Sequence, residues 1–144
     1  MPRRNDNRAM TDLLKTVPMF ATCTKKQLDA IAGISKLVNH DAGRLICKEG
    51  DTGAAFHVIV EGETKVQIGG RTRRRLGPGA FFGEIALLDG GPRSATVVAD
   101  TPVRTLSVPV FSFRSLLRAD PGLSMKMLEE VCRRMRSADT SIHA

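Results

Sequence analysis

Residues 81–96 read Phe81-Phe82-Gly83-Glu84-Ile85-Ala86-Leu87-Leu88-Asp89-Gly90-Gly91-Pro92-Arg93-Ser94-Ala95-Thr96, and this stretch holds the most informative pattern of the chain. It begins with apolar residues, predicts a short turn or helix, breaks at the Gly-Gly-Pro sequence and continues as a strand-like run. A helix that begins near Gly83 leaves free backbone N–H groups at its N-terminus, and such groups bind anions. The planar guanidinium of Arg93 can close on the same anion. The stretch therefore predicts an anion-binding site.

The carboxylate of Glu84 narrows the kind of ligand. An ionised carboxylate only accepts hydrogen bonds, so beside an anion site it suits a ligand that also offers hydroxyl groups. A nucleotide or a sugar phosphate carries both groups. The alternative is a plain surface ion pair between Glu84 and Arg93, worth roughly 0–1 kcal/mol. The ligand interpretation is favoured because Gly83 allows close backbone approach, Ala86 is small and Ser94 adds a hydroxyl beside the guanidinium.

The same residues resemble a known family. Residues 82–88 followed by residues 92–96 are similar to the phosphate-binding cassette of the cyclic nucleotide-binding domain family, the module of cAMP-receptor-like proteins and kinase regulatory subunits. The resemblance implies that the ribose 2′-hydroxyl donates to Glu84, that Arg93 pairs with the cyclic phosphate, and that nearby backbone N–H groups complete the anion site. Val66 and Ala95 would lie against the ribose and base. The implied ligand-binding residues are Gly83, Glu84, Ile85, Ala86, Arg93, Ser94, Ala95 and Val66.

The preferred base is predicted from Ser94. Family members that prefer cyclic GMP often carry Thr directly after the cassette arginine, so Ser94 favours cyclic AMP, although a serine hydroxyl can also reach guanine. The family usually covers the base with a residue of the C-terminal helix. Because no aromatic residue follows Phe113, the expected lid is Met127, Val131 or Met135, or it comes from another chain. Packing of the last helix explains these three residues as well.

Helical patterns flank a β-rich middle. A helix is expected over residues 10–15, and Thr24 with Gln27 predicts a capping box for the next helix. The period then changes to two, which predicts strands over residues 37–40, 44–47, 56–60, 64–68, 71–76, 94–99 and 103–108. Helical spacing returns over residues 109–118 and 120–136. The predicted fold class is mainly β with flanking helices: an antiparallel β-barrel or jelly roll with N-terminal helices, a short phosphate-binding helix and C-terminal helices.

The length of 144 residues fits one domain with its own core. We expect residues 1–9 to be a disordered tail and residues 10–144 to be the cyclic nucleotide-binding domain. No apolar run approaches the roughly 20 residues that span a bilayer, and no secretory core follows the charged first residues, so we expect a cytoplasmic protein without a membrane partner. The cysteines, Cys23, Cys47 and Cys132, are odd in number and far apart, which argues against disulfides, and the histidines show no metal-ligand spacing.

The net charge is +7, from 22 basic and 15 acidic residues. Such a charge can indicate nucleic-acid binding. However, the basic residues are spread along the chain, and no Trp or Tyr is present to stack on bases. We therefore expect a solvated basic surface rather than a nucleic-acid partner.

No arrangement of nucleophile and base predicts catalysis, so we expect neither an enzyme nor a cofactor. The expected function is a stand-alone receptor module for cyclic AMP, with cyclic GMP as the second choice, that moves its C-terminal helices and regulates an effector protein. The sequence does not identify that effector, and a homodimer through the last helix stays open. Two alternatives are a truncated or atypical DNA-binding transcription regulator of the cAMP-receptor type and a non-binding interaction scaffold. The intact Glu84 and Arg93 argue against the scaffold.

Overall fold

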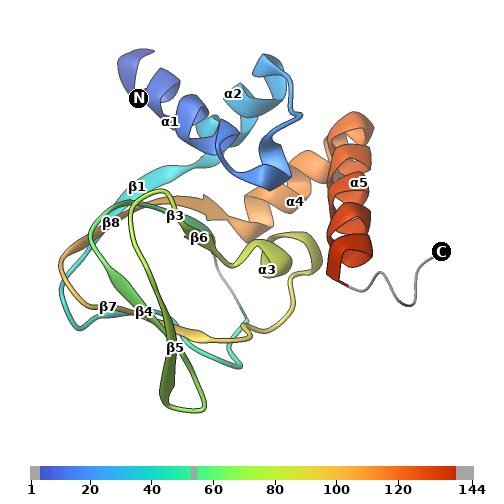
Figure 1. Ribbon diagram of the computed structural model, residues 1–144. Helices are drawn as coiled ribbons and strands as arrows, with labels where there is room; N and C mark the ends of the chain where they lie inside the picture. Colours follow the sequence, from blue (N-terminus) through green and yellow to red (C-terminus); the bar gives the residue numbers. More distant parts are fainter. Residues whose placement is uncertain (1–3, 53–54, 139–144) are drawn as a thin grey trace.

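The computed structural model of the chain describes residues 4–52 and 55–138. Helices occupy both ends of the described chain, and strands fill most of its middle (Figure 1). In chain order the elements are α1 (Arg4–Lys15), the 3-10 helix η1 (Pro18–Phe20), α2 (Lys25–Ile34), β1 (Lys36–His40), β2 (Leu45–Cys47), β3 (Ala55–Glu61), β4 (Thr64–Ile68), β5 (Arg71–Leu76), β6 (Phe81–Phe82), α3 (Glu84–Asp89), β7 (Thr96–Ala99), β8 (Val103–Pro109), α4 (Val110–Ala119) and α5 (Pro121–Ala138).

The strands form two four-stranded antiparallel sheets, with the orders β1-β8-β3-β6 and β2-β7-β4-β5. Among the described strands, β4 and β5 are the one consecutive pair that is hydrogen-bonded, because most connections carry the chain from one sheet to the other. This connectivity is that of a jelly roll with flanking helices. The predicted fold class is confirmed.

The strand after the cassette begins at Thr96, two residues later than the predicted range of 94–99. The backbone of Arg93 is hydrogen-bonded to residues 50 and 51, not to β4. Its N–H donates to the Asp51 carbonyl at 2.8 Å, and its carbonyl accepts from the Gly50 N–H at 2.9 Å. The ladder with β4 therefore starts only at Thr96. These two hydrogen bonds also fix the position of the Arg93 backbone, and with it the origin of the Arg93 side chain.

The N-terminal helices differ from prediction in one respect. α1 begins at Arg4, so residues 4–9, which were predicted to be part of a tail, are helical. Those residues lack the apolar repeat that reveals a helix in a sequence; residues 1–3 lie outside the described part. The predicted capping box is present, with Thr24 Oγ1 accepting from the Gln27 N–H at 3.2 Å and Gln27 Oε1 accepting from the Thr24 N–H at 2.9 Å.

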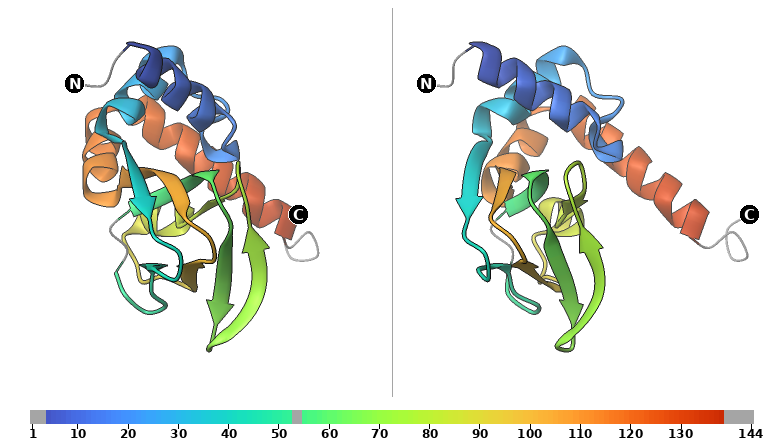
Figure 2. Two further views of the ribbon diagram at one scale, coloured as in Figure 1. Left: turned by 90° about the vertical axis from the view of Figure 1, so that its left-hand side faces the viewer. Right: turned by 60° about the vertical axis from the view of Figure 1, so that its left-hand side comes forward.

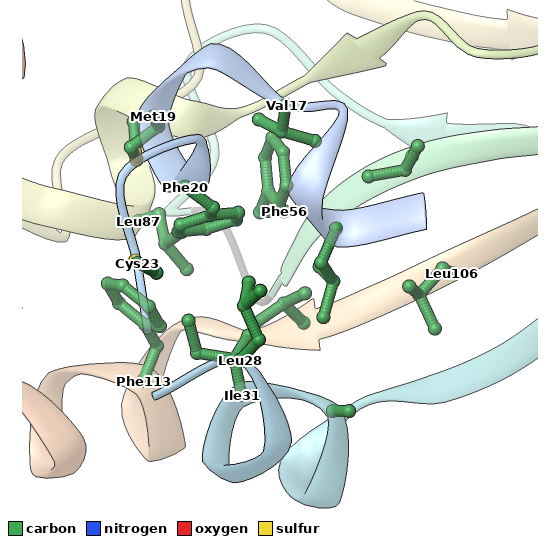
Figure 3. Packing of buried hydrophobic residues seen from close by; sticks show 14 of the residues in the cluster. Val17, Met19, Phe20, Cys23, Leu28, Ile31, Phe56, Leu87, Leu106 and Phe113 are labelled. Atoms are coloured by element: carbon green, nitrogen blue, oxygen red, sulfur yellow. The ribbon is translucent and has the colours of Figure 1, made fainter. Parts of the chain in front are cut away.

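The larger hydrophobic core lies between the helices and the β1-β8-β3-β6 sheet (Figure 3). Phe20 packs against Phe56 and Phe113, with ring centroids 5.9 and 5.8 Å away. Leu87 of α3 is fully buried in this core. A second, smaller cluster fills the space between the two sheets. Burial of Leu87 therefore anchors the short cassette helix against the helical layer.

The long helix α5 lies outside the two sheets (Figures 1 and 2). Its N-terminus is capped by Asp120, whose Oδ1 accepts from the Leu123 N–H at 3.1 Å. Leu123 and Met127 bury its first turns in the larger core. None of the helices in residues 4–52 and 55–138 has the length and apolar character needed to cross a bilayer.

Candidate ligand-binding site

A cavity of about 240 Å³ opens between α3 and the strands of the β2-β7-β4-β5 sheet. All eight site residues predicted from the sequence line it: Val66, residues 83–86 and residues 93–95. The fold thus brings Val66 of β4 to the cassette, although the turn, β5 and β6 separate them in the chain. The ligand contacts of these residues stay predictions.

Gly83 begins the cassette in a conformation that requires glycine. Its φ is +89°, in the left-handed region, and it caps α3, whose first residue is Glu84. A Cβ atom at this position would overlap Nη1 of Arg93. The absence of a side chain at Gly83 therefore gives the Arg93 guanidinium its place directly behind the start of the helix.

Arg93 is buried, with 7% of its surface exposed. Its Nη2 donates to the carbonyl oxygen of Ala55. Its Nε and Nη1 are buried and have no hydrogen-bond partner among the described residues. Burial lowers the pKa of the Arg93 guanidinium from its ordinary value, while Cys47 and the Glu84 carboxylate act in the opposite direction. The cation is thus held in the cavity wall with donors that an anion would satisfy.

Glu84 does not pair with Arg93. Its Oε1 accepts from Nη1 of Arg134 in α5 at 3.2 Å, and the two side chains are 22% and 35% exposed. The alternative of a surface ion pair between Glu84 and Arg93 is therefore wrong. Arg93 lines the cavity and is bonded to the Ala55 carbonyl instead, and the carboxylate of Glu84 is paired with the C-terminal helix.

Arg74 is a cavity residue that the sequence did not indicate. Its exposed side chain lines the cavity from β5, opposite Val66 of β4. The pairing of β4 with β5 shifts by one residue between Gln67 and Val66, so Val66 faces Arg74 rather than Arg73. A regular hairpin from the same sequence places Arg73 there. The sequence carried no signal for this bulge.

The remaining cavity wall is largely apolar. Three of its members, Phe81, Phe82 and Pro92, belong to the stretch 81–96 singled out in the sequence but were not predicted to be ligand-binding residues. The other three, Cys47, Leu76 and Val97, lie on strands and have only the alternating pattern of any strand. Burial raises the pKa of the Cys47 thiol in this wall, and the Arg93 cation opposes the change. These wall residues are Cys47, Leu76, Phe81, Phe82, Pro92 and Val97.

A buried histidine supports the cassette from behind. The His57 ring stacks on Phe82 with centroids 5.0 Å apart, and its Nδ1 lies 3.1 Å from Oγ1 of Thr105. Burial, followed by the charges of His40 and Arg93, lowers the pKa of His57 to about 3. The ring is therefore neutral at physiological pH, and it fixes the aromatic residue that precedes Gly83.

The three lid candidates do not line the cavity. Met127 is 3% exposed and belongs to the larger core, as the packing alternative predicted. Val131 contributes to a groove beside Leu88, and Met135 is 53% exposed. In this arrangement of α5, the described part of the chain places none of them over the ligand site.

Comparisons with known proteins agree with this geometry. The family model described as "Cyclic nucleotide-binding domain" matches residues 37–120. A cAMP-dependent protein kinase regulatory subunit of Colletotrichum orbiculare is 34% identical over 81% of this chain and 30% of its own length. A cyclic nucleotide-gated potassium channel of Mesorhizobium japonicum is 37% identical over 85% of this chain and 34% of its own. The chain thus spans about a third of the length of these curated relatives.

Solved structures show the same architecture. The N-terminal domain of a transcriptional regulator from Streptomyces coelicolor has a TM-score of 0.80 and 29% identity, covering 92% of this chain and 95% of that one. The Thermus thermophilus Catabolite Activator Protein has a TM-score of 0.67 and 30% identity, covering 87% of this chain and 61% of that one. The match of the family model, together with the cassette geometry, shows that this chain belongs to the cyclic nucleotide-binding domain family.

Proposed function

We propose that this chain is a non-catalytic receptor module that binds a cyclic nucleotide in the cavity and regulates a partner protein through its C-terminal helices. One observation carries the proposal: the buried guanidinium of Arg93 has two nitrogens, Nε and Nη1, without a partner among the described residues. Leaving a buried cation partly unsatisfied is costly, and the phosphate of a ligand supplies the missing acceptors.

The cavity residues suit a cyclic nucleotide in particular. The cyclic phosphate carries one negative charge, which one guanidinium and the first N–H groups of α3 can match. Glu84 accepts a hydrogen bond from the ribose 2′-hydroxyl. Val66 and Ala95 lie against the ribose and base. A ligand with a second charge on its phosphate finds no second buried cation among the residues that line the cavity.

Cyclic AMP is the first candidate ligand, on the basis of Ser94. Cyclic GMP is the second candidate, and Arg74 favours it. Guanine presents two acceptors, O6 and N7, to a guanidinium, whereas adenine presents N7 beside its N6 amino donor. Arg74 on the cavity wall can therefore donate two hydrogen bonds to guanine only.

The output of the module is a change in the packing of α4 and α5 around α3. Arg114 of α4 donates from Nη1 to the Leu88 carbonyl at 2.6 Å, so the end of the cassette helix is already tied to α4. The ligand shifts the helices only to the extent that it binds one arrangement better. A partner that contacts α4 or α5 would detect the change.

The assembly of the module is also proposed. The exposed Leu128 and Met135 on α5 can pair two copies, because 60% and 53% of their surfaces are open to solvent. Sedimentation equilibrium with and without ligand tests this dimer. A DNA-binding regulator is the alternative output, since one similar structure is the N-terminal domain of a transcriptional regulator. It would require a DNA-binding domain in the same protein.

The binding mode is tested by removing the ribose 2′-hydroxyl of the ligand and the carboxylate of Glu84, singly and together. Calorimetric titrations compare cyclic AMP with its 2′-deoxy analogue, on the parent chain and on Glu84→Ala. The parent chain is expected to bind the deoxy analogue more weakly than cyclic AMP, by the free energy of one charged hydrogen bond, about 1.5–3 kcal/mol. Glu84→Ala is expected to bind both ligands alike. If the parent binds the two ligands equally, Glu84 does not hold the ribose.

A further inference from the structure

The ligand cavity has two walls, and one short segment of the chain is hydrogen-bonded to both. Val66 and Arg74, the residues proposed to contact the base, belong to the β4–β5 hairpin. The cassette supplies the other wall, with Arg93 for the phosphate. The connecting segment is residues 49–51, which follow β2. Its contacts therefore fix how the base side and the phosphate side of the cavity stand to each other.

Glu49 makes the contact to the hairpin. Its backbone N–H donates to Oγ1 of Thr96 in β7 at 2.9 Å, and its side-chain Oε1 accepts from the Gly69 N–H at 3.0 Å. Gly69 and Gly70 are the two residues of the turn between β4 and β5. A single residue thus joins β7 to the tip of the hairpin.

We propose, building on the proposed function, that Glu49 is a positioning residue for the nucleotide base. Its carboxylate holds the β4–β5 hairpin in the place where Val66 and Arg74 line the cavity. Glu49 does not line the cavity itself, so it acts on the ligand through the hairpin.

The tip of the hairpin depends on this contact because the sheet does not reach it. Among the described strands, β7 pairs with β4 only as far as Gln67, and β5 is the edge strand of the sheet. Gly69 and Gly70 have positive φ angles, +58° and +78°, and no side chains that could pack against the sheet. The carboxylate of Glu49 supplies the connection that the strand ladder does not.

The same contact bears on which arginine lines the cavity. The register of the hairpin shifts between Val66 and Gln67, and this bulge places Arg74 rather than Arg73 opposite Val66. A bulge disrupts the ladder locally, so the pairing on both sides of it must be held. The β7 ladder holds one side, and the bond from Gly69 to Glu49 holds the turn on the other side.

The contacts of the segment to the cassette come from backbone atoms. The Gly50 N–H donates to the Arg93 carbonyl at 2.9 Å, and the Arg93 N–H donates to the Asp51 carbonyl at 2.8 Å. A substitution of the Glu49 side chain leaves these two bonds in place. Loss of the carboxylate is therefore expected to loosen the base side of the cavity and to spare the phosphate side.

Three variants test the proposal by calorimetric titration. Glu49→Ala removes the acceptor for the Gly69 N–H, whereas Glu49→Gln keeps an acceptor oxygen without the charge. The control Glu61→Ala removes an exposed carboxylate at the end of β3 that does not line the cavity. The ligands are cyclic AMP, cyclic GMP and the cyclic phosphate of methyl ribofuranoside, which has the ribose and the phosphate but no base.

The expected losses concern only ligands that carry a base. Glu49→Ala is expected to bind both cyclic nucleotides roughly 2- to 10-fold more weakly than the parent, the range for one hydrogen bond, and to bind the baseless ligand unchanged. Glu49→Gln and Glu61→Ala are expected to bind all three ligands like the parent. In Glu49→Ala the Gly69 amide is also expected to exchange its hydrogen faster than in the parent.

A double variant gives a readout that does not need the baseless ligand. Glu49→Ala and Arg74→Ala act on the same contact with the base, so together they are expected to lose less affinity for cyclic GMP than the sum of their separate losses. Glu49→Ala and Glu84→Ala act on different parts of the ligand, and their losses are expected to add.

The outcomes separate this proposal from the receptor function. If the parent binds a nucleotide and Glu49→Ala binds it equally well, or weakens the baseless ligand as much, Glu49 does not position the base and the receptor function stands. Additive losses with Arg74→Ala, or a Glu49→Gln variant as weak as Glu49→Ala, also overturn the positioning role. If the parent binds neither nucleotide, the receptor function fails, and the role of Glu49 fails with it.

Discussion

Alanine at Gly83 is expected to damage both stability and binding, and alanine at Gly90 provides the control. The two glycines cap the two ends of α3 and have similar left-handed backbone angles, with φ of +89° and +69°. Alanine at either position carries the backbone cost of a left-handed residue, about 1–2 kcal/mol. The surroundings differ. At Gly90 a Cβ would lie 3.5 Å from Nη1 of Arg114, which is an ordinary contact, whereas at Gly83 it would overlap Nη1 of Arg93.

The overlap sets the difference between the two variants. The Arg93 guanidinium is buried and held by the Ala55 carbonyl, so it must leave its place to admit the Cβ. Overpacking of this kind costs roughly 1–3 kcal/mol beyond the backbone term. Moving the guanidinium also removes a charged contact to the ligand phosphate, worth about 1.5–3 kcal/mol, or roughly a 10- to 150-fold loss of affinity.

The assay combines urea unfolding with calorimetric titration of both variants. Gly90→Ala is expected to lose only the backbone term and to keep the affinity of the parent. Gly83→Ala is expected to be less stable than Gly90→Ala and to bind at least about 10-fold more weakly. Equal stabilities and equal affinities in the two variants would refute the placement of Arg93 behind Gly83.

Three further predictions concern single side chains. Arg93→Met is expected to lose ligand binding while its unliganded melting temperature stays unchanged or rises, because a buried cation with unpaired donors is removed; a calorimetric affinity like that of the parent would contradict this. Arg74→Ala is expected to lose more affinity for cyclic GMP than for cyclic AMP, with Arg73→Ala, outside the cavity, as the control; equal losses for the two ligands would exclude contact between Arg74 and the base. His57 has a pKa of about 3 in the fold and an ordinary value of 6.5, so only the unfolded chain takes up this proton between those limits. The contribution of neutral His57 to the free energy of unfolding is therefore lost as pH falls from about 6.5 toward 3, by roughly 1.4 kcal/mol per pH unit. Urea unfolding of His57→Gln should be less sensitive to pH across this window than that of the parent, and identical slopes would contradict it.

Local signals in the sequence predicted the features that depend on near neighbours. The capping box of α2 needs only Thr24 and Gln27, and β4 shows its alternation within residues 64–68. The cassette is equally local, because Gly83, Glu84 and Arg93 lie within one short stretch. These features were predictable because the interactions that define them connect residues close together in the chain.

Features that depend on register or on distant contacts were not predictable. The bulge between β4 and β5 decides that Arg74 rather than Arg73 lines the cavity, and the two residues are of the same type. The contact between Glu84 and Arg134 joins residues 50 positions apart. Met127 has a side chain suited to cover the base, but the packing of α5 buries it in the core. In each case tertiary packing selects among positions that the sequence leaves equivalent.

The most direct test of the central claim is a calorimetric titration of the purified chain with cyclic AMP and, in parallel, with cyclic GMP. The proposed function predicts saturable binding of one ligand per chain, with cyclic AMP tighter, and loss of that binding in Arg93→Met. Tighter binding of cyclic GMP would support the receptor function and assign the choice of base to Arg74. Neither heat nor a thermal shift with either ligand would contradict the claim and leave the domain as a scaffold that retains Glu84 and Arg93 without their ligand.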